Sequence, residues 1–242
     1  VKLTIKETLP LDIKYDFEFN SKYICDSLQT EMLTKKCSLI HGEPGCGKTR
    51  FLINFINQFK SKGQNNCIII ANRQSYAYFS HKIFSAFGFK NYLNKDTKEI
   101  LGKKPPSRII ISLQSFWRLN INDIFYHDII VDESEACLSS FNSQTLNQVI
   151  QDNRTQDNSE NKNQDNKNLE LCSARAIKSI KNFVTVLNKS NRTIFLDGFL
   201  TQKTYDFCVK LFGIENIFSV RNRYRTMEFN ATNFSHISTF EQ

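Results

Sequence analysis

The chain has 242 residues, of which 40% are apolar, and its formal net charge at pH 7 is +8. A chain of this length can form one large α/β domain or at most two small ones. The apolar content, which includes 21 Phe, argues against a disordered chain. The positive charge suits a polyanionic partner such as a nucleic acid, although many solvated surfaces are equally basic.

The seven cysteines are scattered and contain no C-x-x-C pair. This pattern is typical of reduced thiols in an intracellular protein, and it does not suggest a disulfide framework or a zinc site. No stretch approaches 18 apolar residues, and the first residues lack a charged and then apolar leader. The sequence therefore predicts an intracellular protein with no membrane span and no secretion signal.

Short β-branched runs alternate with longer segments of helical apolar spacing, which predicts an α/β fold with a mostly parallel sheet and helices on both faces. Strands are expected at residues 37–41, 67–71, 108–112, 128–131, 193–196 and 216–220. Helices are expected at residues 21–34, 48–61, 75–87, 114–120, 142–150, 170–188 and 201–212. The continuous isoleucine runs at 68–70 and 109–111 predict strands that are buried on both faces.

Residues 42–49, GEPGCGKT, match the phosphate-binding loop pattern G-x-x-x-x-G-K-[ST] between an expected strand and an expected helix. That context argues against a chance match in a glycine-rich turn. Glycines in such a loop let backbone N–H groups converge on the β-phosphate of a nucleoside triphosphate. Lys48 would bring positive charge to the β- and γ-phosphates, and the Thr49 hydroxyl would coordinate Mg²⁺. The predicted nucleotide-binding residues are Gly42, Pro44, Gly45, Cys46, Gly47, Lys48, Thr49 and Arg50.

Polar side chains follow three of the expected strands, at 72–75, at 112–115 and at 197–201. Ligands gather at the carboxyl ends of parallel strands, and hydroxyl, amide and guanidinium groups there suit contacts with nucleic-acid phosphates. Each group taken alone could equally be a helix N-cap. The aromatic pair that follows, at 116–117, could stack a base or pack in the core. The predicted nucleic-acid contacts are Arg73, Ser75, Ser112, Gln114 and Ser115.

An apolar run at 128–131 is followed directly by Asp132 and Glu133. Paired carboxylates at this edge of the sheet predict ATP hydrolysis, with Asp132 holding Mg²⁺ and Glu133 polarising the attacking water. Lys48, Asp132 and Glu133 are therefore the predicted catalytic residues, and Thr49 and Asp132 the predicted metal ligands. The alternative is that these acidic residues only cap the next helix.

Residues 151–168 contain no aliphatic or aromatic side chain and cannot contribute to a core. They are expected to form a disordered insertion between two helices, either a tolerated surface loop or a regulatory segment.

The order of five segments resembles the first RecA-like domain of superfamily-two helicases, and most of all the herpesvirus-type origin-of-replication binding proteins. The segments are GEPGCGKT, NRQSYAYF, SLQSFWRL, DIIVDESEACLSSF and FLDGFLTQKTYDF. The family's softer elements match Arg73, Ser75, Ser112, Leu113, Ser115, Arg118, Leu196, Asp197, Thr204 and Tyr205. DESE at 132–135 departs from the DEAD and DEAH quartets, which weakens an assignment to those RNA helicases.

The resemblance implies a RecA-like P-loop NTPase that uses ATP and Mg²⁺ and acts on single-stranded or forked DNA, with RNA a less favoured partner. It implies a role in DNA replication, which would place the protein in the nucleus if its source is eukaryotic. The expected organisation is an N-terminal extension at 1–20, a RecA-like ATP-binding domain at 21–225 and a linker at 226–242.

Helicases of this kind place a second RecA-like lobe after the first, and its arginines complete the ATP site. Only 45 residues follow Asp197, and no Q-x-x-G-R-x-x-R string occurs. The chain is therefore expected to be one lobe of something longer, a fragment or a truncated product, which hydrolyses ATP slowly and does not unwind processively. The alternatives are a nucleotide-dependent DNA-binding or scaffold module without effective catalysis, an RNA helicase or a small-molecule kinase.

Overall fold

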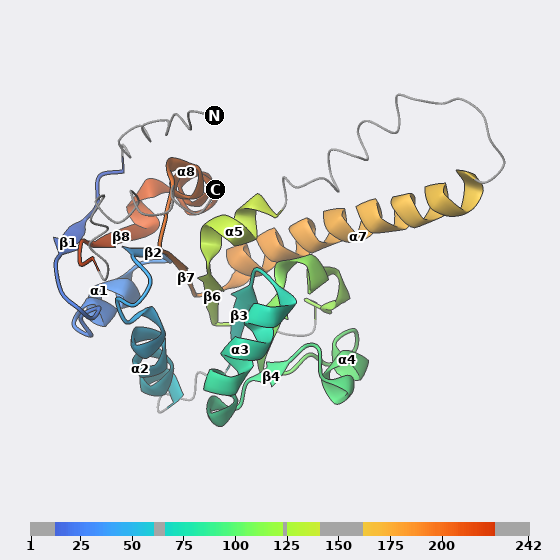
Figure 1. The fold of residues 1–242 in the computed structure, drawn as a ribbon, viewed down its shortest axis with the longest axis horizontal. Helices are drawn as coiled ribbons and strands as arrows, with labels where there is room; N and C mark the ends of the chain where they lie inside the picture. Colours follow the sequence, from blue (N-terminus) through green and yellow to red (C-terminus); the bar gives the residue numbers. More distant parts are fainter. Residues whose placement is uncertain (1–12, 61–65, 123–124, 141–161, 226–242) are drawn as a thin grey trace, which may run out of the picture.

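A computed structural model describes residues 13–60, 66–122, 125–140 and 162–225 (Figure 1). The strands of this part are β1 (Phe17–Phe19), β2 (Cys37–Gly42), β3 (Cys67–Ala71), β4 (Lys90–Asn91), β5 (Arg108–Ser112), β6 (Asp128–Asp132), β7 (Arg192–Asp197) and β8 (Ile217–Asn222). They form one sheet in the order β1-β8-β2-β7-β6-β3-β5-β4, and every pairing between them is parallel.

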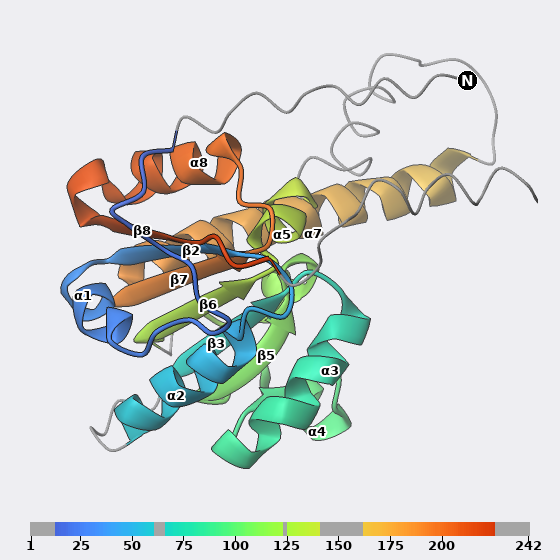
Figure 2. The same cartoon turned by 60° about the vertical axis from the view of Figure 1, so that its left-hand side comes forward.

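Helices cover both faces of this sheet. They are α1 (Leu28–Thr34), α2 (Lys48–Lys60), α3 (Gln74–Phe84), α4 (Lys95–Ile100), α5 (Ser134–Ser139), α7 (Lys162–Lys189) and α8 (Gln202–Phe212), with 3₁₀ turns η1 (Ser85–Phe87), η2 (Leu113–Arg118) and η3 (Ile214–Asn216). Figure 2 shows α5, α7 and α8 on one side of the sheet and α2 and α3 on the other. The expected α/β architecture is confirmed.

The core lies in the central strands, whose isoleucines are buried on both faces. Each residue of β3, β5 and β6 is buried, and Ile69 pairs with Ile110 on one side and Ile130 on the other. A strand covered by helices on both faces needs apolar side chains at successive positions, which explains the runs in the sequence. All six expected strands are present, with bounds that shift by at most two residues.

Several short elements differ from the expectation. The edge strands β1 and β4 and the helices α4 and α5 have two to six residues each, too few to show a period in the sequence. The expected helix at 114–120 is the 3₁₀ turn η2, and the first helix begins at Leu28 and not at 21. Residues 142–150 lie outside the described residues. Because β1 pairs with β8, the sheet includes residues 17–19, which were expected to belong to an extension.

The long helix α7 starts earlier than expected, at Lys162, so residues 162–168 are helical and not a disordered insertion. A helix that is already nucleated extends through backbone hydrogen bonds and needs no apolar side chain at each added residue. Phe183 provides the packed anchor, because its ring stacks 6.3 Å from that of Phe207 on α8. Residues 151–161 lie outside the described residues.

Because the strands are parallel, the segments that follow β2, β3, β5, β6 and β7 all emerge at one edge of the sheet, called here the strand-end edge. These segments carry the residues that the sequence singles out. Within the described ranges, none of the helices is both long enough and apolar enough to cross a membrane.

Candidate nucleotide and nucleic-acid site

The phosphate loop connects β2 to α2 and depends on two glycines in the left-handed region. Gly45 has φ 86° and Gly47 has φ 82°, values that a residue with a Cβ adopts at a cost. A Cβ at Gly47 would also lie 2.8 Å from Cδ1 of Tyr23, so a steric clash disfavours any residue other than glycine at this position. The loop is held from outside, because the Ile24 N–H donates to the Cys46 carbonyl at 3.2 Å.

The Lys48 side chain, on the first residue of α2, turns back over this loop. Its ammonium donates to the carbonyls of Gly42, at 2.5 Å, and Glu43, at 3.2 Å. A lysine ammonium has three donors and a flexible stem, so it can exchange such carbonyls for phosphate oxygens. The positive charge therefore lies at the point where a helix N-terminus already favours an anion.

Asp132, the last residue of β6, is buried, and both of its oxygens accept hydrogen bonds. The Glu133 N–H donates to Oδ1 at 3.1 Å, and the Tyr76 hydroxyl on α3 donates to Oδ2. Burial raises the pKa of Asp132, and these donors, with the charge of Lys48, act in the opposite direction. Burial also raises the pKa of Tyr76, so its hydroxyl remains a proton donor.

Glu133 lies just beyond the end of β6 in a left-handed conformation, with φ 55° and ψ 52°. Non-glycine residues adopt this conformation at a cost, and such strain often marks functional positions. Burial raises the pKa of Glu133, and the negative charges of Asp132 and Asp197 raise it further. A carboxylate with a raised pKa is a better proton acceptor than an ordinary glutamate.

Asp197, at the end of β7, connects this acidic pair to the neighbouring strand. Its carboxylate accepts the N–H of Glu135 at 2.7 Å and that of Phe199 at 2.8 Å. Glu135 in turn accepts the N–H of Thr201 at 2.7 Å and its hydroxyl at 2.8 Å. The DESE segment and the start of α8 are therefore held together by side-chain hydrogen bonds.

These groups surround one open cavity of about 430 Å³, lined among others by Lys48, Thr49, Tyr76, Asp132, Glu133 and Asp197. Asp132 and Asp197 both lie at the strand-end edge, where Asp132 is in register with Leu196, whereas Asp128 lies at the other end of β6. There Asp128 accepts a hydrogen bond from Arg192 at 2.6 Å. The Thr49 hydroxyl and the Asp132 carboxylate offer the hard oxygen donors that Mg²⁺ prefers, so the residues fit this ion.

Not every residue predicted for nucleotide binding lines the cavity. Pro44, Gly45 and Gly47 do, whereas Gly42, Cys46 and Arg50 are not among its walls. Cys46 is fully buried, and burial raises the pKa of its thiol, which indicates a packing role for this side chain. The Arg50 guanidinium lies 4.9 Å from the ring centroid of Tyr23, outside the cavity.

The predicted nucleic-acid contacts divide into two groups. Arg73, Ser75 and Gln114 are exposed, and Ser115 is half-buried. Ser112 is only 3% exposed, and its hydroxyl donates to that of Ser115 at 3.1 Å. The structure therefore places four of the five where a ligand could reach them and makes Ser112 a support for Ser115.

Phe116 packs in the core, with its ring edge-on to Phe183 at 5.9 Å, whereas Trp117 is half-buried at the surface. Tyr76 and Glu135 were not predicted from the sequence. Tyr76 stands three residues after Arg73, so one helical turn joins the exposed start of α3 to the cavity. That spacing is the signal that could have identified it.

The sequence profile of the family described as origin of replication binding protein matches residues 24–155. The Acanthamoeba polyphaga mimivirus protein named "Uncharacterized putative helicase R8" is 25% identical over 237 residues, 89% of this chain and 20% of its own. The "Replication origin-binding protein" of Psittacid herpesvirus 1 (isolate Amazon parrot/-/97-0001/1997) is 22% identical over 188 residues, 76% of this chain and 18% of its own. The chain thus spans about a fifth of the length of these relatives.

Among solved structures, a DEAD box protein from the hyperthermophile Methanococcus jannaschii matches with a TM-score of 0.50 and 12% identity. The match covers 81% of this chain and 49% of that protein. At this identity the likeness shows the fold alone, and the fold is RecA-like.

Proposed function

Because the chain belongs to the origin of replication binding protein family, we propose that it is the ATP-binding and ATP-hydrolysing lobe of a DNA helicase. One observation carries the proposal: a single cavity collects Lys48 and Thr49 from the start of α2, and Asp132 and Glu133 from the end of β6. An ammonium, a hydroxyl and two carboxylates are the groups that hydrolysis of a nucleoside triphosphate requires.

In the proposed mechanism, the loop N–H groups and the Lys48 ammonium bind the β- and γ-phosphates. Thr49 and Asp132 would hold Mg²⁺, which when bound neutralises negative charge on those phosphates. Asp132 is kept in position by Tyr76 and by the backbone N–H of Glu133. The carboxylate therefore needs little reorientation when nucleotide arrives.

Glu133 acts as the base that orients a water molecule and accepts its proton during attack on the γ-phosphate. The raised pKa of Glu133 favours proton acceptance. Its backbone is left-handed, and its side chain lines the cavity just beyond the end of β6. Glu133 must be ionised to act, so the rate should fall on the acid side at a pH above the ordinary pKa of a glutamate.

The DNA strand would follow accessible groups at the same strand-end edge: Arg73 and Ser75 at the start of α3, and Gln114 and Ser115 on η2. Guanidinium, hydroxyl and amide donors at helix starts suit phosphate contacts, which position a strand without reading its bases. Single-stranded or forked DNA is the proposed partner. A second RecA-like lobe would complete the ATP site, in keeping with relatives about five times as long as this chain.

The test is phosphate release by the chain with and without single-stranded DNA, with Glu133→Gln as the control. We expect slow basal turnover, because an arginine supplied from a second lobe contributes about 10³- to 10⁵-fold in such enzymes. We expect DNA to accelerate the parent and to have no effect on the variant. Hydrolysis that ignores DNA, or that responds equally to RNA, would argue for another class of P-loop ATPase. Processive unwinding by the chain alone would contradict the proposed need for a second lobe.

A further inference from the structure

The helix α7 extends past the strand-end edge. It precedes β7 by a short turn and runs antiparallel to the strands, so its C-terminus lies at the opposite edge of the sheet. Its 28 residues span about 42 Å, whereas β5 and β6 have five residues each and span about 17 Å. The first half of α7 therefore projects beyond the edge where the nucleotide cavity opens, as Figures 1 and 2 show.

Two polar side chains of α7 fasten it to the η2 turn. The Ser179 hydroxyl donates to the Gln114 carbonyl at 3.2 Å and accepts the N–H of Trp117 at 3.1 Å. The Asn182 amide donates to the carbonyls of Phe116 and Leu119, at 2.9 and 3.2 Å. The exposed side of η2 and the adjoining side of α7 therefore form one continuous surface.

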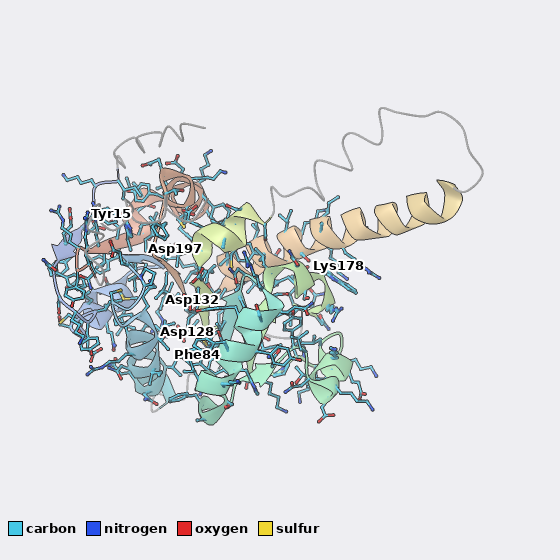
Figure 3. All side chains as sticks on the ribbon, in the orientation of Figure 1. Tyr15, Phe84, Asp128, Asp132, Lys178 and Asp197 are labelled. Carbon is cyan, nitrogen blue, oxygen red and sulfur yellow. The ribbon has the colours of Figure 1, made fainter. Side chains whose placement is uncertain are left out.

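This surface concentrates positive charge around one indole ring. The guanidinium of Arg118, on η2, lies 5.2 Å from the ring centroid of Trp117, and that of Arg175, on α7, lies 4.6 Å from it. Each contact is a favourable cation–π interaction. Both arginines are exposed, and Lys178 adds a third exposed cation one helical turn along α7 (Figure 3).

Among the described residues, the two guanidinium groups have no carboxylate partner within ion-pair distance. Residues 174–189 of α7 contain Arg175, Lys178, Lys181 and Lys189 and no Asp or Glu. Two like charges held on one ring repel each other, and an anion placed between their unused N–H donors would relieve that repulsion.

We propose that Trp117, Arg118 and Arg175 form a phosphodiester-binding site for the DNA strand as it leaves Ser115. The site rests on the function proposed above and extends the strand's path from the end of β5 onto the projecting part of α7. Each guanidinium group can bind two phosphate oxygens at once. The contacts with the Trp117 ring position both arginines for this binding. Lys178, one helical turn closer to the sheet than Arg175, adds a further cation beside this path.

The test compares the double variant Arg118→Gln/Arg175→Gln with the matched control Lys203→Gln/Lys210→Gln, which removes two exposed charges from α8. The measurement is binding of fluorescent single-stranded oligonucleotides over a salt series. The site variant should lower the magnitude of the salt slope by roughly 1.4, because each contact with a single strand contributes about 0.7. The control should keep the parental slope. Equal slopes in the site variant and the control would overturn the inference.

An oligonucleotide length series places the contact along the path. The parent should gain affinity up to the length that reaches α7, and the double variant should stop gaining several nucleotides earlier. Nucleotide binding by the double variant, followed with a fluorescent ATP analogue, should match that of the parent, because neither arginine lines the cavity. A parent that binds ATP but no single-stranded DNA would overturn both this site and the proposed DNA partner. DNA-stimulated hydrolysis with an unchanged length profile would overturn this site alone.

Discussion

The nucleotide cavity and the DNA-facing surface share the strand-end edge, yet they are built in different ways. The cavity is made by residues that adjoin strand ends, with Lys48, Asp132 and Glu133 facing one space. The DNA-facing surface depends on segments that meet only in three dimensions, because α7 fastens the η2 turn through Ser179 and Asn182. In the nucleotide cavity, the chemistry of hydrolysis determines which residue types are needed. In the DNA-facing surface, packing determines which side chains are exposed to a ligand.

This difference predicts different sensitivities. At the cavity, one substitution should remove one chemical step and leave the other steps intact, because each side chain has a separate role. At the DNA-facing surface, substitutions should have small effects that depend on exposure. The variants below test that division, from the largest expected effect to the smallest.

Glu133→Gln should reduce the hydrolysis rate by about 10²- to 10⁴-fold, the usual contribution of a positioned general base. Binding of ATP should stay at the parental level, because the amide has nearly the shape of the carboxylate and Glu133 is not a proposed phosphate or metal contact. Single-turnover phosphate release and equilibrium binding of a fluorescent ATP analogue measure the two effects separately. If affinity fell along with the rate, Glu133 would be a binding residue and not the base.

Lys48→Ala should weaken ATP binding by about 10- to 100-fold, because a hydrogen bond to a charged group contributes about 1.5–3 kcal/mol. The control is Lys203→Ala, which makes the same change at an exposed position on α8. Isothermal titration with a non-hydrolysable ATP analogue gives both dissociation constants. If Lys48→Ala bound ATP as tightly as the parent, the assignment of the phosphate loop to the nucleotide site would be wrong.

Asp132→Asn should raise the Tm, because it removes a buried negative charge. The amide oxygen can still accept the Glu133 N–H, and its NH₂ group can donate to the Tyr76 hydroxyl, which is both donor and acceptor. Since burial raises the folded-state pKa of Asp132, protonation stabilises the folded parent as the pH falls through that pKa. The difference in Tm between Asp132→Asn and the parent should therefore be largest at neutral pH and should decrease in acid. A lower Tm for Asp132→Asn at neutral pH would contradict this.

The central strands and the phosphate loop were predictable because each carries its own local signal. Continuous isoleucine runs identify β3 and β5, and the loop pattern fixes Lys48 relative to β2 and α2. The edge strands β1 and β4 form through pairing with distant partners, which no local pattern records. The spacing from Arg73 could have placed Tyr76 near the cavity, but no local pattern records its hydrogen bond to Asp132, 56 residues away.

The smallest effect separates two residues that the sequence treated alike, Arg73 and Ser112. Arg73→Ala removes an exposed cation at the start of α3, so the salt slope of single-stranded DNA binding should fall by about 0.7. Ser112→Ala removes a buried hydroxyl that donates to Ser115, so it should reduce the free energy of unfolding by about 1 kcal/mol and leave the slope unchanged. Salt titrations of DNA binding and denaturant unfolding of both variants give the four values. A slope that fell equally in both variants would mean that burial does not separate DNA contacts from structural residues, and the division between the two regions would be lost.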